Sequence, residues 1–234
     1  MLSDDLLELQ RLDTTADQLT NRRARLPERE PAAAAVEALA SARRRAAEIE
    51  RRDGELTEAI ASLERDGEAL TTQRTRLQAQ LKTVIAPRAA EALMHELETL
   101  RARRDELDDQ ELAHLEEQSA LEDERSAING REPELVAAAD AAGSQLRAAE
   151  GAIDAELATV RADRAALAAR LDAGVLAQYE RLRQRMGGVA VATLDGKRCR
   201  GCHLDLSASE LDQVRATPAG ELSDCPQCGR LLVP

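Results

Sequence analysis

Four cysteines near the C-terminal end carry the clearest chemistry in this 234-residue sequence. They form two C-x2-C pairs, Cys199-Arg200-Gly201-Cys202 and Cys225-Pro226-Gln227-Cys228, separated by residues 203–224. Each pair can place two thiolates on one metal ion from a tight turn, in which Gly201 relieves backbone strain. Two pairs complete a tetrahedral shell of four sulfurs, which suits Zn²⁺. Because four cysteines leave no coordination position open, Cys199, Cys202, Cys225 and Cys228 predict one structural zinc ion.

Two alternatives use the same part of the chain. Disulfides or redox-active pairs are disfavoured, because no cysteine precedes Cys199 and no βαβ pattern surrounds either pair. His203 directly follows Cys202 and could replace a ligand. Since the cysteine set is already complete, we expect His203 at the surface or beside the ligands.

Short strands should surround the metal. Val189-Ala190-Val191-Ala192 and Leu231-Leu232-Val233 are typical of strands, and Asp195-Gly196 predicts a hairpin turn. Residues 187–234 are therefore expected to form a C4-type zinc ribbon. A domain this small buries little apolar surface, so the metal should supply much of its folding free energy.

Residues 1–186 have the pattern of a long antiparallel coiled-coil hairpin. A 3-4 spacing runs from Leu39 to Val84 through mostly Leu, Ala and Ile, and a second such seam follows Pro87. A few seam positions are not apolar, among them Asp53, Gly67, Arg74, Arg104 and Gln118. The segment Ile85-Ala86-Pro87 predicts a reversal, near residues 83–88, that pairs residues whose numbers sum to about 172. Proline and glycine predict breaks near 27–31 and 129–133. A parallel dimer with a helix continuous through Pro87 is the disfavoured alternative, because proline removes a helical hydrogen bond.

Composition excludes several classes of protein. The chain is 43% hydrophobic but has one Tyr and no Phe or Trp, which argues against a thick core and most large-pocket enzymes. No nucleophile–base pair or phosphate-binding loop is evident, so we expect no enzyme and no small-molecule substrate. The net charge of −12 disfavours bulk binding to DNA or anionic lipid. Without an apolar run of membrane-spanning length or a signal peptide, we expect a cytoplasmic protein with no membrane partner.

A basic region interrupts the acidic chain where the hairpin meets the ribbon. It predicts a recognition patch for nucleic acid or an acidic partner. Arginines that complement the dipole at a helix C-terminus are an equally weighted alternative. At the hairpin tip, Val84 and Ile85 could dock a partner, although closing the last layer of the seam is the favoured interpretation. The patch comprises Arg181, Arg183, Arg185, Lys197, Arg198 and Arg200.

Beyond these patterns, the sequence resembles the bacterial C4-type zinc-ribbon, coiled-coil helical-hairpin family, a domain-of-unknown-function family. The resemblance covers essentially the whole chain, and the zinc motifs are its specific part. It implies a helical hairpin ending in a zinc ribbon, with the four cysteines as zinc ligands. Relatives in that family act as adaptors or chaperones in flagellar assembly and type III secretion, and some bind a transcription factor or mRNA. The residues that carry the resemblance are Glu91–Leu97, Tyr179, Gly187–Val191, Cys199–Cys202 and Cys225–Leu232.

Two functional hypotheses follow. The first is a non-enzymatic, zinc-binding coiled-coil adaptor or chaperone-like protein that binds an unidentified protein partner. The alternative is a nucleic-acid-binding or RNA-polymerase-associated regulator that uses the region 181–202 and the ribbon. Regulators that insert a coiled-coil tip into the polymerase use acidic residues there, whereas this tip has none, which counts against them. Tyr179, the one aromatic residue, is expected to act as a wedge between hairpin and ribbon.

Overall fold

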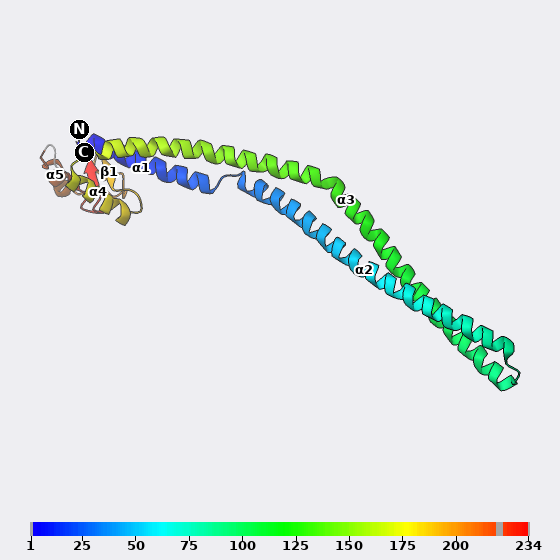
Figure 1. Ribbon diagram of the computed structural model, residues 1–234. Helices are drawn as coiled ribbons and strands as arrows, with labels where there is room; N and C mark the ends of the chain where they lie inside the picture. Colours follow the sequence, from blue (N-terminus) through cyan, green and yellow to red (C-terminus); the bar gives the residue numbers. More distant parts are fainter. Residues whose placement is uncertain (1, 219–221, 234) are drawn as a thin grey trace. The chain divides into compact units, whose positions relative to one another are not determined.

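The computed structural model describes residues 2–218 and 222–233. The fold is mainly helical, a long hairpin followed by a small four-stranded sheet, as the sequence predicts (Figure 1). Two compact units are present, one of residues 32–142 and the other of residues up to 31 together with those from 143 onward. The elements are α1 (Leu2–Ala24), α2 (Arg29–Thr83), α3 (Pro87–Ala168), α4 (Ala173–Arg185), β1 (Val191–Asp195), β2 (Arg198–Cys199), α5 (Ala208–Arg215), β3 (Ser223–Asp224) and β4 (Leu231–Val233).

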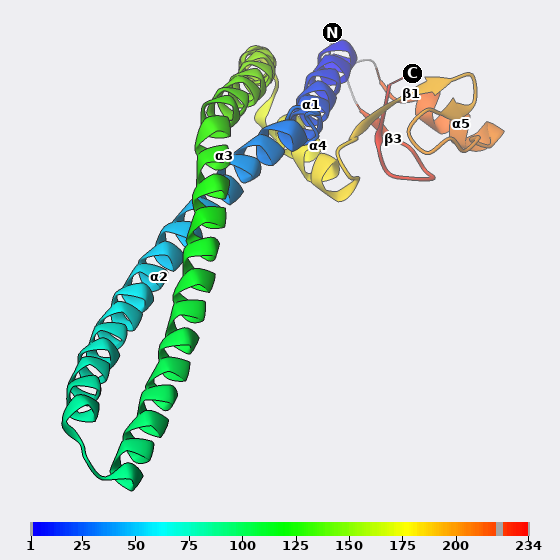
Figure 2. The same ribbon diagram turned by 90° about the vertical axis from the view of Figure 1, so that its right-hand side faces the viewer.

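The unit of residues 32–142 is the tip-bearing part of the hairpin, formed by α2 and α3. The chain reverses in three residues between Thr83 and Pro87 (Figure 2). Pro87 opens α3, a position where its missing N–H and fixed φ cost the helix nothing. Arg52 Nε lies 2.7 Å from Glu117 Oε1 on the opposite helix. The two residue numbers sum to 169, near the predicted 172, so the helices pair antiparallel in the expected register.

Polar residues of the two predicted seams face one another. Gln118 Nε2 donates to Asp53 Oδ1 at 3.1 Å and to Thr57 Oγ1 at 3.0 Å. A Cβ at Gly67 would overlap the guanidinium of Arg104, so this seam glycine leaves the room that Arg104 occupies. Matched polar positions favour one register over others in a coiled coil. The polar residues at seam positions therefore help to specify how the helices align.

The predicted break near residues 129–133 is wrong, because α3 runs without interruption through Asn129-Gly130 and Pro133. An interior proline removes one backbone hydrogen bond and commonly bends a helix without ending it. Packing on the partner helix supports this stretch, since Arg43 Nε donates to Glu132 Oε1 at 2.8 Å. Near residues 27–31, in contrast, α1 and α2 are separate helices, with Pro27 between them.

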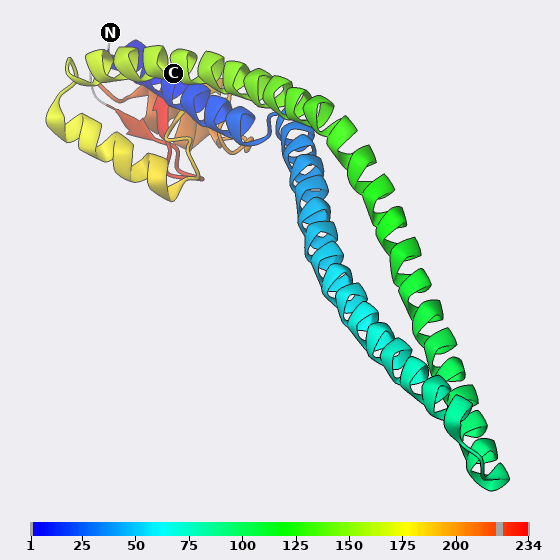
Figure 3. The ribbon, with the colours of Figure 1, turned by 45° about the vertical axis from the view of Figure 1, so that its right-hand side comes forward.

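The second unit contains α1, the C-terminal part of α3, α4 and the ribbon. Helices α1 and α3 lie side by side (Figures 1 and 3), and Leu19 and Leu26 pack with Ile153 and Leu157. Helix α4 begins after Asp172, whose Oδ1 accepts hydrogen bonds from the backbone N–H groups of residues 174 and 175, an N-cap. The hairpin thereby ends in a turn that sends α4 toward the sheet.

The sheet has the strand order β2-β1-β4-β3, with β1 and β4 parallel and the outer pairs antiparallel. Strand β1 starts at Val191, two residues later than the sequence predicts, and Gly196 adopts φ 61° in the turn to β2. Side chains alternate between two faces. Val191 and Leu231 pack toward α1 and α4, whereas Ala192 and Leu232 pack toward the cysteines. One pair of strands thus connects the hairpin with the candidate metal centre.

Helix α5 is an element that the sequence analysis did not anticipate. Ser207 and Glu210 form a capping box at its start, in which each side chain satisfies the other's backbone N–H. Its Val214 packs beside the cysteines. Within residues 2–218 and 222–233, no helix has the length and apolar character required to cross a bilayer.

Candidate metal centre

The four cysteines converge on one point of the ribbon. Their Sγ atoms all lie within 4.8 Å of one another, and Cys202 Sγ is 4.0 Å from Cys225 Sγ. A tetrahedral zinc ion with Zn–S bonds of about 2.3 Å requires sulfurs about 3.8 Å apart. Cys199 and Cys225 are buried, while Cys202 and Cys228 are half-buried. The arrangement therefore fits a single ion held by four thiolates.

Both C-x2-C pairs adopt the same backbone structure. In each, the residue after the second cysteine donates its N–H to the carbonyl of the first cysteine, and the first cysteine's N–H is bonded to the carbonyl five residues later. Such matched loops aim both sulfurs of a pair at the same point. The bonds are His203 N to Cys199 O (2.8 Å), Gly229 N to Cys225 O (2.7 Å), Cys199 N to Leu204 O (3.0 Å) and Cys225 N to Arg230 O (2.7 Å).

His203 occupies in the first loop the place that Gly229 occupies in the second. Both residues have left-handed backbone angles, with φ 62° at His203 and 71° at Gly229. Such angles are unfavourable for a residue with a Cβ. The His203 side chain is exposed and is not among the clustered ligands. The tight turn here is made by a residue with a side chain, at a cost in conformational energy.

Gly201 is required for a different reason from the strain relief that the sequence suggested. Its φ is not positive. A Cβ at this position would lie 2.8 Å from both Ala192 Cβ on β1 and Arg230 Cδ. The first cysteine loop lies so close to the sheet at position 201 that a Cβ there would require its neighbours to move.

The thiols differ in how readily they ionise. Burial raises the pKa of the Cys225 thiol to about 12 and also raises that of Cys202. Burial opposes ionisation at Cys228 as well, but hydrogen bonds from Arg230 outweigh it and lower its pKa to about 7. Cys228 can thus present a thiolate near neutral pH, while Cys202 and Cys225 release their protons as a metal binds.

A buried glutamine joins the ribbon to the hairpin. Gln10 on α1 is 7% exposed, and its Oε1 accepts from the backbone N–H of Ala190 at 2.6 Å and of Val191 at 3.2 Å. Its Nε2 donates to the Gly188 carbonyl at 2.8 Å. Gln10 therefore hydrogen-bonds the backbone N–H and C=O groups that lead into β1, as a neighbouring strand would.

A second polar contact lies beside it. Tyr179 on α4 is fully buried, and its hydroxyl donates to Asp13 Oδ2 on α1 at 2.7 Å. Burial and the nearby Asp13 carboxylate raise the pKa of Tyr179. Arg164 Nε donates to the other oxygen of Asp13 at 3.2 Å, and Arg183 Nε lies 3.5 Å from Oδ2. Tyr179 is buried at the junction where the sequence placed it. Gln10 and Asp13, the residues of α1 that make these two contacts, were missed, because they lie beside the leucine stripe of α1 and have no motif.

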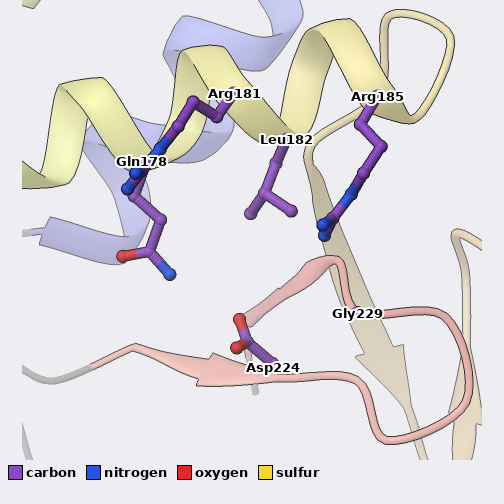
Figure 4. A pocket seen from close by; sticks show the side chains of 6 residues that line it. All are labelled: Gln178, Arg181, Leu182, Arg185, Asp224 and Gly229. Carbon is purple, nitrogen blue, oxygen red and sulfur yellow. The ribbon is translucent and has the colours of Figure 1, made fainter.

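The predicted basic patch does not form a continuous free surface. Four of its six residues have carboxylate partners in the described part of the chain. Arg181 and Arg185 have none among residues 2–218 and 222–233, and both line a pocket against the second cysteine loop (Figure 4). The partnered residues are Arg183 with Asp17 (2.7 Å), Lys197 with Asp205 (3.1 Å), Arg198 with Asp205 (3.1 Å) and Arg200 with Asp195 (2.5 Å).

Two protein-family models match the chain. Residues 9–187 match the CT398-like coiled coil hairpin domain, which is more than half of the sequence. The chain belongs to the CT398-like coiled coil hairpin family. Residues 198–232 match the C4-type zinc ribbon domain, so all four clustered cysteines lie inside the ribbon match.

Several solved structures share the fold of this chain. CT398 from Chlamydia trachomatis superposes with a TM-score of 0.83 at 22% identity, covering 99% of this chain and 98% of that one. A Mycobacterium smegmatis structure gives a TM-score of 0.75 at 24% identity over 99% and 97% of the two chains. The HP0958 protein from Helicobacter pylori gives 0.66 at 17% identity over 98% and 95%. The uncharacterized protein Rv2229c of Mycobacterium tuberculosis is 29% identical over 250 residues, 97% of this chain and 93% of its own length.

Proposed function

We propose that this protein is a non-enzymatic adaptor in which Cys199, Cys202, Cys225 and Cys228 hold one structural zinc ion. The observation that carries the proposal is the complete set of four sulfurs within 4.8 Å. A catalytic zinc site has three protein ligands and leaves a position for water or substrate. A four-thiolate shell stabilises a fold instead, and a small ribbon depends on that contribution. The thiols require a reducing compartment, which agrees with the proposed cytoplasmic location.

Protein binding is the second part of the proposal. Gln10 on α1 is hydrogen-bonded to the backbone at the start of the ribbon, and Tyr179 on α4 packs in one cluster with Val191 and Leu231. These contacts support a ribbon that is held against the helices and does not hang on a free linker. At the hairpin tip, Ile85 is 96% exposed and does not close the seam, contrary to the favoured expectation. In the proposed function, this apolar side chain at the tip contacts the partner protein. The proposed adaptor therefore offers a partner surface at the tip and another at the ribbon.

The experiment has two readouts on the full-length protein. Metal analysis of the purified chain should give one zinc per chain, and a Cys225→Ser variant should lose it. Affinity capture from lysate of the native cells should then be compared for the wild type, Ile85→Asp and Cys225→Ser. Partners lost only with Ile85→Asp bind the tip, and those lost only with Cys225→Ser bind the ribbon. A zinc-free wild type, or one that captures no protein, would contradict the proposal.

Nucleic-acid binding is the less favoured function. Four of the six basic residues that suggested it are paired with carboxylates, which reduces the charge available to phosphates. The described part of the ribbon also lacks an aromatic side chain on which a base could stack. A gel-shift assay at low salt tests this function. If the protein binds nucleic acid in a salt-sensitive way, and Arg181→Ala and Arg185→Ala abolish that binding, nucleic-acid binding becomes the favoured function.

A further inference from the structure

A pocket of about 390 Å³ lies between α4 and the second cysteine loop, and no cysteine lines it (Figure 4). This volume is within the range of ligand-binding pockets. In Figure 4, Leu182 and Arg185 extend from α4 toward the segment that carries Asp224 and Gly229. Leu182 is buried and gives the pocket an apolar part. The pocket is lined by Gln178, Arg181, Leu182, Arg185, Asp224 and Gly229.

The polar side chains of this pocket have no hydrogen-bonding or ionic partners in the part of the chain that the structure describes. Among residues 2–218 and 222–233, no hydrogen bond or ion pair engages the side chains of Gln178, Arg181, Arg185 or Asp224. The neighbouring basic residues behave differently, since Lys197 and Arg198 both pair with Asp205 at 3.1 Å. The arginines and Asp224 lie on opposite walls without meeting. A ligand that carries both an anionic acceptor and an N–H donor could engage both walls.

The chemistry of the walls selects the ligand class. Arg181 and Arg185 are four residues apart and therefore project from the same face of α4. Guanidinium groups bind carboxylates with two parallel hydrogen bonds. Asp224 would repel a polyphosphate or nucleic acid, which brings several negative charges, but it can accept a backbone N–H. A peptide supplies this combination of one carboxylate, an N–H and an apolar neighbour for Leu182.

We propose that this pocket binds an acidic segment of a partner protein, with a carboxylate between Arg181 and Arg185 and a backbone N–H on Asp224. The proposal rests on the proposed adaptor function and names the chemistry of the partner that the ribbon end recognises. It divides the basic patch into a recognition pair, Arg181 and Arg185, and structural residues that are already paired, such as Arg198. The arginines of the pocket are exposed and unpaired, so replacing them should leave the fold intact.

The test measures binding of a dye-labelled, eight-residue peptide of alternating Glu and Leu to the zinc-loaded, full-length protein. Arg181→Gln with Arg185→Gln should weaken binding about tenfold or more, because two charge-assisted contacts are lost. Lys197→Gln with Arg198→Gln is the matched control, since it removes the same charge from paired residues, and it should change affinity less than about twofold. A control peptide of alternating Gln and Leu, which has no side-chain carboxylate, should not bind.

Three outcomes would overturn the proposal. Equal losses in the two double variants would mean that the peptide responds only to overall charge. Tighter binding of an eight-nucleotide RNA than of the peptide would assign the pocket to phosphates. No binding by the wild type at about 1 mM peptide would remove the site. Metal content and lysate capture measured on the same samples separate these results from a failure of the adaptor function, which does not require this pocket.

Discussion

Replacing Gln10 with alanine should weaken the attachment of the ribbon to the hairpin, although only one side chain is removed. Gln10 makes three hydrogen bonds to the backbone leading into β1, at 2.6, 2.8 and 3.2 Å. Ala190 is fully buried, so its N–H would lose its partner where water does not reach it. An orphaned buried donor costs about 1–3 kcal/mol, and each lost bond adds up to about 1 kcal/mol. We therefore expect Gln10→Ala to destabilise this junction by about 2–4 kcal/mol.

The assay is amide hydrogen exchange of the zinc-loaded, full-length protein. A loss of about 2 kcal/mol in local stability corresponds to roughly thirtyfold faster exchange at Ala190. Gln18→Ala is the matched control, because Gln18 is an exposed residue of the same helix, and it should leave that exchange unchanged. Gln10→Glu keeps the acceptor for the N–H groups but loses the donor to Gly188, so an intermediate rate is expected. If the Ala190 amide exchanges at the same rate in Gln10→Ala and in Gln18→Ala, Gln10 does not hold the ribbon.

The remaining predictions concern the same unit. Tyr179→Phe removes the hydroxyl from Asp13 and should lower stability by about 1–2 kcal/mol, measured by urea unfolding, with Tyr179→Ala costing more. His203→Gly should raise stability by about 1 kcal/mol, because glycine adopts φ 62° without strain, whereas Gly229→Ala should lower it. Equal melting temperatures for these two variants would contradict the argument. Gly201→Ala should weaken zinc retention against a chelator, since its Cβ has no room beside β1. Removing zinc should melt the ribbon and leave most far-ultraviolet helical signal, and a complete loss of helix would refute this.

Local sequence patterns were sufficient to predict those parts of the structure in which one physical requirement dominates. Pro87 and the 3-4 spacing predicted a hairpin and its reversal, because a coiled coil must keep one apolar face and proline is favoured in the first turn of a helix. The C-x2-C spacing predicted the four-sulfur cluster, because a tight turn is the shortest way to aim two sulfurs at one ion.

The same rules failed where packing competes with a local preference. Pro133 predicted a break, but α3 continues through it, because the helical hydrogen bonds on either side remain when one is lost. Gly201 suggested a strained turn, yet its role depends on how close β1 lies. The net charge of the basic patch was countable from sequence, but whether Arg198 faces solvent or Asp205 was not.

The sequence by itself determined the hairpin, the ribbon and the residues able to bind zinc, because each depends on spacing along the chain. The tertiary structure alone decided how ribbon and hairpin are joined. Gln10 and Asp13 acquire their roles from partners more than 160 positions away, Ala190 and Tyr179. It also decided which arginines are free, since ion pairing depends on distance in space and not on order in the chain.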